Sequence, residues 1–178
     1  TLGEEKREAE AGSVLSAAEL LGTAEEACKI KAADHGKIYL TKADGSRETL
    51  GYSGSMELRH SEQGYTVVNK ISLEEYICGV LPSEMPEKFH VEALKAQAIC
   101  ARSYACMQMV KGDYAALGAH VDDSTNYQVY NKNPAGEKSV KAVEDTGGQV
   151  LKYKGNVVEA YYYSTSCGHT GTMENWNL

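Results

Sequence analysis

This chain lacks the features that mark a membrane, nucleic-acid-binding or disulfide-rich protein. No apolar run approaches the roughly 20 residues that a helix needs to cross a bilayer, and no secretory signal pattern is present. The net charge is −7, so the chain has no basic excess to attract nucleic acid or an anionic membrane surface. The cysteines number five, an odd count without framework spacing. The composition therefore indicates one globular domain of 178 residues, with or without an appendage.

The most informative stretch, residues 72–109, predicts two consecutive helices. Ser72 and Glu75 have the S-x-x-E spacing of a capping box, which starts the first helix. Its apolar stripe comprises Leu73, Tyr76, Ile77 and Val80. The second helix is predicted from about Val91 to Met109, with small or apolar residues on one face at Leu94, Ala98, Ala101, Ala105 and Met109.

A proline-bracketed elbow, LPSEMP, joins the two helices and holds one carboxylate, Glu84. Pro82 and Pro86 disfavour the helical conformation at Leu81 and Met85, so the first helix is predicted to end before the elbow. A lone glutamate in a turn is often only a solvated charge near a helix end. The alternative is a general acid, because Leu81, Met85 and the prolines provide apolar surroundings that desolvate a carboxyl group.

Three segments in the same order resemble one known family. They are VLPSEMP followed by EALKAQAICARSYA, then DDSTNYQVY at 122–130, and AYYYSTSCGHTGTMEN at 160–175. Over residues 50–178 the chain resembles the stage II sporulation protein D family, which contains peptidoglycan lytic transglycosylases and amidase-enhancer relatives. The glutamate of the elbow is the catalytic acid in that family, so the resemblance implies this role for Glu84.

The candidate substrate contacts come partly from this resemblance. Lys95 and Arg102 follow Glu84 by 11 and 18 residues and are candidates to orient it or to contact substrate. For Lys95 a surface ion pair is the alternative, whereas Arg102 lies within the core helix and is expected to be buried or to face the groove. The resemblance adds, as residues that line a glycan groove, Asp123, Thr125, Gln128, Tyr130, Tyr163, Ser164, Ser166 and His169.

The sequence also bears on a zinc site and on a cysteine nucleophile. Some members of the family bind zinc through Cys, His and Cys, but the matching positions here are Val121, Asn126 and Tyr127, so we predict no metal and no cofactor. Cys167 and His169 are two residues apart and raise the alternative of a cysteine hydrolase. That alternative lacks an identifiable orienting Asp or Asn and an oxyanion donor.

The predicted fold class is α+β, with short antiparallel sheets packed around the central helical pair and a substrate groove that crosses Glu84. Residues 1–34 are predicted as an N-terminal helical segment and residues 35–178 as the catalytic domain. Alternating patterns around turn dipeptides predict hairpins over 36–53, 56–72 and 149–166. A short helix is predicted over 137–146, ended by Gly147-Gly148.

The single carboxylate of the elbow fits the activity that the resemblance implies. Hydrolysing glycosidases generally need two carboxylates, whereas a lytic transglycosylase can use one, because the C6 hydroxyl of N-acetylmuramic acid replaces water. The resemblance implies cleavage of peptidoglycan glycan strands during sporulation and engulfment, with 1,6-anhydro products. The alternative is a non-catalytic peptidoglycan-binding module that stimulates a partner amidase.

The remaining expectations concern partners and location. The acidic charge favours glycan strands without peptides, because peptide carboxylates would be repelled. A cell-wall amidase and other engulfment proteins are expected partners, and nucleic acid is not. The resemblance implies a location outside the cytoplasm of a sporulating bacterium, with a membrane anchor upstream of Thr1. The family pattern is also expected to continue beyond Leu178.

Overall fold

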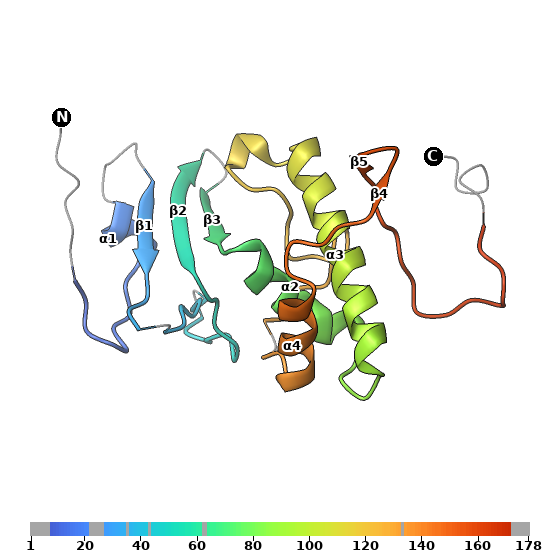
Figure 1. The fold of residues 1–178 in the computed structure, drawn as a ribbon. Helices are drawn as coiled ribbons and strands as arrows, with labels where there is room; N and C mark the ends of the chain where they lie inside the picture. The colour runs from blue at the N-terminus through green and yellow to red at the C-terminus, as the bar shows by residue number, and fades with distance from the viewer. Residues whose placement is uncertain are drawn as a thin grey trace.

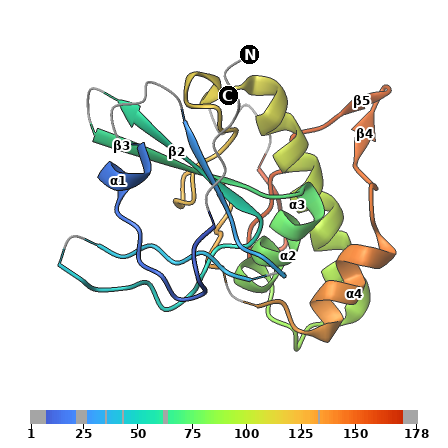
Figure 2. The same cartoon turned by 90° about the vertical axis from the view of Figure 1, so that its left-hand side faces the viewer.

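The computed structural model describes residues 8–21, 27–34, 36–42, 44–61, 64–132 and 134–171. A layer of three helices lies between a three-stranded antiparallel sheet on one side and a small hairpin on the other (Figure 1). In the view turned by 90°, helix α1 (Ala17–Leu21) lies beside the sheet, with which it makes contact (Figure 2). This arrangement confirms the predicted α+β class. Within the described part of the chain, no helix is long and apolar enough to cross a membrane.

The two predicted helices form, and the first is longer than expected. Helix α2 spans Leu73–Glu84 and starts at the predicted capping box. It continues through Pro82, so the prediction that it ends before the elbow was wrong. Pro82 lies only two residues before the helix end, which limits the loss to one backbone hydrogen bond, and burial of the preceding turn offsets that loss. Met85 is extended (φ −140°, ψ 114°), as expected of a residue before Pro86.

Helix α3 spans Val91–Lys111 and is the longest element of the fold. The His90 imidazole accepts a hydrogen bond from the Glu92 N–H at 3.2 Å and caps its start. Gly112 adopts the left-handed conformation (φ 68°) and ends it. The chain then makes a short 3₁₀ helix, η1, at Ala115–Leu117.

Helix α4 spans Glu137–Asp145, as predicted. Its first turn is capped from outside the helix, because the Glu87 carboxylate accepts a hydrogen bond from the Ser139 N–H at 2.9 Å. Gly136 precedes the helix and lies against this carboxylate, where a Cβ atom would collide with it. The segment after the elbow thereby fixes the position of α4.

The main core lies where α2, α3 and α4 meet. Alanines on α3, at 98, 101 and 105, allow the three helices to approach closely. The buried members of this core are Ile77, Val80, Leu81, Leu94, Ala98, Ala101, Ala105, Ala142 and Val143. The residue spacing of α3 therefore predicted its buried face correctly from Leu94 to Ala105. Met109 was expected on the same face and is 46 % exposed.

The sheet has the strand order β1-β2-β3, with β1 at Cys28–Lys31, β2 at Ser55–Ser61 and β3 at Gly64–Lys70. Both pairings are antiparallel, and Leu58 stands opposite Cys28 and Val67. Helix α1, at Ala17–Leu21, contacts β2. The second hairpin pairs β4 (Lys152–Tyr153) with β5 (Asn156–Val157) around Lys154-Gly155.

Two sequence expectations for the first 53 residues need correction. The segment 1–34 is not wholly helical, because β1 pairs with β2 and joins the sheet. Among the described residues of 36–53, the predicted hairpin is reduced to two isolated bridges, Ile38 with Tyr52 and Thr41 with Arg47. Its polar tip offers little apolar surface to bury, so the alternation does not produce full strands. The division into a segment 1–34 and a domain 35–178 stays a prediction.

A buried arginine joins the three helices. The Arg102 side chain on α3 is only 1 % exposed. Its guanidinium donates to both Glu74 carboxylate oxygens on α2, at 2.9 and 2.7 Å. It also donates to the backbone carbonyl of Gln149 at 3.1 Å and, at 3.4 Å, to that of Val143 on α4. This bidentate pair lowers the pKa of Glu74 and holds the N-terminal end of α2 against α3 and α4.

We predict that Arg102→Met lowers the free energy of unfolding by about 3 kcal/mol or more, because it leaves buried carbonyl oxygens without donors. The matched control is Lys95→Met. In the wild type, Lys95 forms an ion pair with Asp145 at 3.1 Å near the surface. That variant should cost less than about 1 kcal/mol. Urea unfolding followed by circular dichroism measures the free energy of unfolding of both variants. Equal losses of this free energy would contradict the proposed importance of the Arg102 hydrogen bonds.

The sheet carries a second charge cluster around Glu57 on β2. Lys70 and Arg59 hydrogen-bond to its carboxylate and lower the pKa of Glu57 from 4.5 to about 2. The unfolded chain therefore binds this proton more readily than the folded chain does. The resulting stabilisation is complete above pH 4.5 and is lost as the pH falls towards 2.

We predict that the urea midpoint of the wild type falls more steeply between pH 5 and 2 than that of Glu57→Gln. The control is Glu137→Gln, an exposed carboxylate on α4 that forms no ion pair within the described residues. It should preserve the wild-type slope. Parallel acid profiles for Glu57→Gln and the wild type would contradict this assignment.

Candidate active site

Glu84 is the last residue of α2, at the point where the chain turns towards α3. Its Oε1 atom accepts a hydrogen bond from the backbone N–H of Val129, 45 residues later in the chain, at 3.0 Å. The side chain is half-buried, and no Lys or Arg of the described residues forms an ion pair with it. The carboxylate is therefore oriented by a backbone dipole and is not neutralised by a cation.

A tyrosine hydroxyl lies beside this carboxylate. Burial raises the pKa of Tyr162, and the neighbouring Glu84 charge raises it further, against the opposing effect of a hydrogen bond from Gln128. The Tyr162 phenol consequently keeps its proton across the accessible pH range. It is available as a hydrogen-bond donor next to Glu84.

Gln128 lies beneath the site and does not form its wall. Its side chain is 2 % exposed, too buried to contact a substrate directly. The amide nitrogen donates to the Ala101 carbonyl at 3.1 Å and to the Tyr162 hydroxyl at 3.0 Å. Gln128 therefore connects α3 with the tyrosine beside Glu84, and the structure favours a positioning role for it.

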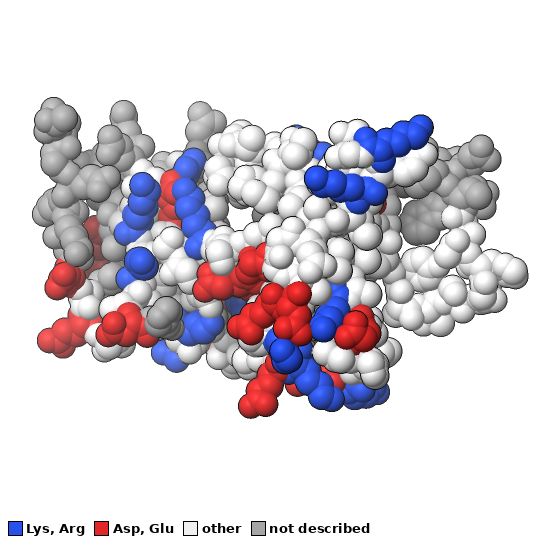
Figure 3. All heavy atoms as spheres, in the orientation of Figure 1, with Lys and Arg blue, Asp and Glu red and all other residues white. Residues whose placement is uncertain are grey.

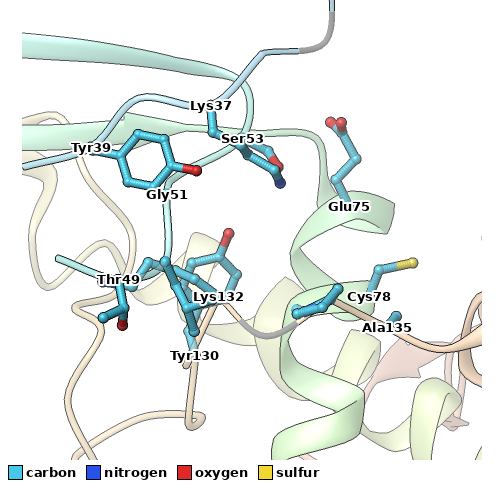
Figure 4. A pocket seen from close by; sticks show the side chains of 13 residues that line it. Lys37, Tyr39, Thr49, Gly51, Ser53, Glu75, Cys78, Tyr130, Lys132 and Ala135 are labelled. Atoms are coloured by element: carbon cyan, nitrogen blue, oxygen red, sulfur yellow. The ribbon is translucent and has the colours of Figure 1, made fainter. Parts of the chain in front are cut away.

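Tyr130 packs against the middle of α2. Its ring stacks on Tyr76, with centroids 5.4 Å apart and planes 18° apart. The stack lies directly over Gly79, where no side chain intervenes. Tyr130 also lines a hollow of about 320 Å³ between α2 and the loop 37–53, together with Lys37, Tyr39 and Lys132 (Figure 4).

The cations of this hollow already have protein partners. The Lys132 ammonium bonds to Glu48 at 2.6 Å and to the Tyr52 hydroxyl at 3.0 Å. Lys37 hydrogen-bonds to Ser53. These contacts tie the loop 37–53 to residues 130–132. Both lysines therefore have polar partners within the protein and need no ligand.

Lys95 and Arg102 do not join Glu84. Arg102 bonds to Glu74, at the other end of α2 and about 15 Å along the helix from Glu84. Lys95 pairs with Glu92 at 3.2 Å and with Asp145 at 3.1 Å. Sequence spacing suggested both residues as substrate contacts. In the structure, the polar contacts of both residues stabilise the packing of the helices instead.

The remaining candidates are spread over two exposed segments. Asp123 accepts a hydrogen bond from the Tyr52 hydroxyl at 3.3 Å, and Thr125 is exposed in the same loop. The other four are exposed on the segment after Tyr162, which runs away from the helices in Figure 1, and comprise Tyr163, Ser164, Ser166 and His169. Within the described residues, no hydrogen bond links any of these six to Glu84. Their roles as groove residues stay predictions.

Metal-ligating side chains do not cluster in the described part of the chain, and the cysteines form no disulfide. Across the described ranges, no group of three or more His, Cys, Asp or Glu side chains could hold a metal ion. All five cysteines are free, and burial raises the pKa of the Cys78, Cys100 and Cys106 thiols. Cys167 is exposed.

The sequence reasoning missed Tyr162 and the Val129 N–H. Alternation along the segment could have found the tyrosine, because Ala160 is buried and residue 162 therefore points to the same side. Tyr161 and Tyr163 are exposed instead. A backbone donor such as Val129 has no signature in a side-chain pattern.

The stack over Gly79 gives a prediction with a definite sign. Alanine is normally about 1 kcal/mol better than glycine inside a helix. At position 79, however, a Cβ atom would overlap the Tyr130 ring, with Cδ2 only 2.9 Å away. We therefore predict that Gly79→Ala destabilises the protein by about 1–3 kcal/mol in urea unfolding.

The double variant with Tyr130→Ala is the control for that prediction. Without the ring, Gly79→Ala should be neutral or stabilising relative to Tyr130→Ala alone. An additive double-mutant cycle would show that the stack does not constrain α2.

Comparisons with known proteins place part of the chain in a family. Residues 61–153 match the family model described as stage II sporulation protein. An uncharacterised protein of Brachyspira hyodysenteriae is 37 % identical over 141 residues, which is 79 % of this chain and 38 % of the relative. Stage II sporulation protein D of Bacillus subtilis is 39 % identical over 121 residues, 60 % of this chain and 35 % of its own.

A third relative has a different name. The amidase enhancer of Bacillus subtilis is 40 % identical over 100 residues, which is 56 % of this chain and 13 % of the relative. The chain thus spans little more than a third of the length of the first two relatives. The family model nevertheless covers more than half of the chain and includes the elbow, α3 and α4. The chain belongs to the stage II sporulation protein D family.

Proposed function

We propose that this chain is a peptidoglycan lytic transglycosylase with Glu84 as its only catalytic carboxylate. The observation that carries the proposal is the environment of Glu84: one backbone donor at 3.0 Å, a protonated phenol beside it, and no cationic partner among the described residues. A carboxyl group that must give and then take a proton in one cycle is better served without a permanent counter-ion, which would hold it ionised.

The reaction requires only one proton carrier. Protonated Glu84 donates to the glycosidic oxygen between N-acetylmuramic acid and N-acetylglucosamine, and the C1–O bond breaks. The resulting carboxylate then removes the proton of the C6 hydroxyl as O6 bonds to C1, which closes the 1,6-anhydro ring and restores the acid. Tyr162 would orient the carboxylate between the two steps, and Gln128 would hold Tyr162.

The net charge supports strands without stem peptides as the substrate. Acidic and basic side chains lie together over the lower part of the helical layer, while lysines lie over the β4–β5 hairpin (Figure 3). With a net charge of −7, the protein would repel peptide carboxylates. Such a substrate lies in the cell wall, so the proposal places the protein outside the cytoplasm and in cell-wall remodelling during sporulation.

We predict that Glu84→Gln reduces formation of anhydro-muramyl ends by at least about 100-fold, because glutamine cannot transfer the proton. Purified peptidoglycan and amidase-stripped glycan strands would be digested and the soluble products analysed by mass spectrometry. The matched control is Glu144→Gln, an exposed glutamate on α4, which should digest the strands like the wild type. The urea midpoint of Glu84→Gln is measured in parallel to verify folding.

Three results would change the assignment. Wild-type activity in Glu84→Gln would refute the acid. Reducing ends in place of anhydro ends would indicate hydrolysis, with Asp122 or Asp123 to be tested as the second carboxylate. Comparable cleavage of peptide-bearing glycan would refute the substrate preference.

The second candidate is a non-catalytic module that stimulates a cell-wall amidase. The similarity to the amidase enhancer of Bacillus subtilis favours it, although that relative is matched over only 13 % of its length. In this case the chain would sediment with glycan without cleaving it, and Glu84→Gln would stimulate the amidase as well as the wild type. Loss of stimulation on removing residues 1–34, with glycan binding intact, would identify that segment as the contact for the amidase or another engulfment protein.

A further inference from the structure

A second hollow, of about 400 Å³, lies at the far end of α3 and has no part in the chemistry described above. We call it the tyrosine pocket. Its lining comes from the last turns of α3, the loop after it, residues 126–127 and residues 159–161, and consists of Tyr104, Gln108, Lys111, Asp113, Tyr114, Asn126, Tyr127, Glu159 and Tyr161.

The aromatic walls form two pairs of rings. Tyr104 and Tyr161 meet edge to face, with centroids 6.1 Å apart. Tyr114 and Tyr127 meet at a tilt of 52°, with centroids 5.8 Å apart. The Tyr114 hydroxyl is fixed by a hydrogen bond to Asp122 at 2.7 Å, so its ring is held in place before any ligand arrives.

The polar groups of the pocket are arranged around Glu159. One oxygen of this carboxylate accepts hydrogen bonds from Gln108 at 2.7 Å and from Lys111 at 2.6 Å. The exposed Asn126 side chain has no hydrogen-bond partner among the residues that the structure describes. The lining carries one cation and two carboxylates, Asp113 and Glu159, so its charge disfavours an anionic ligand.

This combination selects the chemistry of the ligand. Fixed aromatic faces accept the C–H face of a pyranose ring, and amide and carboxylate groups around them hydrogen-bond to its hydroxyl and acetamido groups. A muramic acid ring brings a carboxylate, which the pocket would repel. An N-acetylglucosamine ring is uncharged and matches the lining.

The pocket and the Glu84 site are built on neighbouring residues. Tyr104 lies close enough to Tyr76 and Tyr162 to influence their ionisation. Tyr161, on the pocket wall, is the chain neighbour of the tyrosine beside Glu84. From Tyr104 to Lys111 the pocket follows α3 for about 10 Å.

We propose that the tyrosine pocket is a distal saccharide subsite that binds an uncharged N-acetylglucosamine ring of the glycan strand held at Glu84. The subsite rests on the proposed function for the identity of the strand, but its affinity for the sugar can be measured without turnover. It would hold the strand at a point away from the broken bond, so that longer strands are bound more tightly than short ones.

The test uses the full chain and a β-1,4-linked tetramer of N-acetylglucosamine, with the dissociation constant measured by calorimetry. Tyr127→Ala removes one ring wall and should weaken binding about five- to tenfold. Tyr127→Phe keeps the ring and loses only the long hydrogen bond to Asp113 at 3.4 Å, so it should bind within twofold of the wild type. Tyr153→Ala, at an exposed ring on β4 outside the pocket, is the matched control.

The outcomes separate this proposal from the proposed function. Equal binding by Tyr127→Ala and Tyr153→Ala, or no binding of the tetramer by the wild type at millimolar concentration, overturns the subsite even if Glu84-dependent cleavage is found. Weakened binding in Tyr127→Ala, with no cleavage of any strand by the wild type, supports the subsite and refutes the proposed transglycosylase activity. Circular dichroism and the urea midpoint verify that Tyr127→Ala folds, and Tyr114→Ala provides a second variant of the same wall.

Discussion

The buried guanidinium of Arg102 is the interaction on which the arrangement of the helices depends. It reaches from the middle of α3 to the first turn of α2 and to backbone carbonyls at and beyond the end of α4. A charge that is 1 % exposed is tolerable only with all of these acceptors in place. Because these hydrogen bonds fix the N-terminal end of α2, they also fix the direction of the helix axis. That direction sets the position of Glu84, about 15 Å away at the other end of α2.

At that other end, the site is assembled from parts that are distant in sequence. Glu84 comes from α2, its backbone donor from Val129, and the phenol beside it from Tyr162. Gln128 connects them, since its buried amide holds both α3 and the tyrosine hydroxyl. A carboxylate positioned in this way relies on tertiary structure for its orientation, so loss of packing in the core would disable the site before any catalytic group is altered.

The elements with local causes could be predicted from the sequence. The capping box at Ser72 and the alanine face of α3 predicted the two helices within a few residues. The errors arose where tertiary contacts decide: burial carries α2 through Pro82, and the strand at Cys28–Lys31 forms because β2 offers it an edge. The site followed the same rule. Glu84 could be found from its motif, whereas the Val129 N–H has no side-chain signature and Arg102 has a structural partner that spacing could not indicate.

The two tyrosine groups give α3 a further role in the proposed reaction. Tyr162 lies over one part of the helix, near Glu84, and the tyrosine pocket lies over its last turns. A strand bound across both would contact the tyrosine rings and polar groups of the pocket at one end and the single acid at the other. An overall acidic protein can then bind the uncharged rings of the polymer while it repels the charged peptide branches, because binding derives from rings and repulsion from the net charge. Affinity and selectivity would therefore arise from different residues, so that either can change without loss of the carboxylate that breaks the bond.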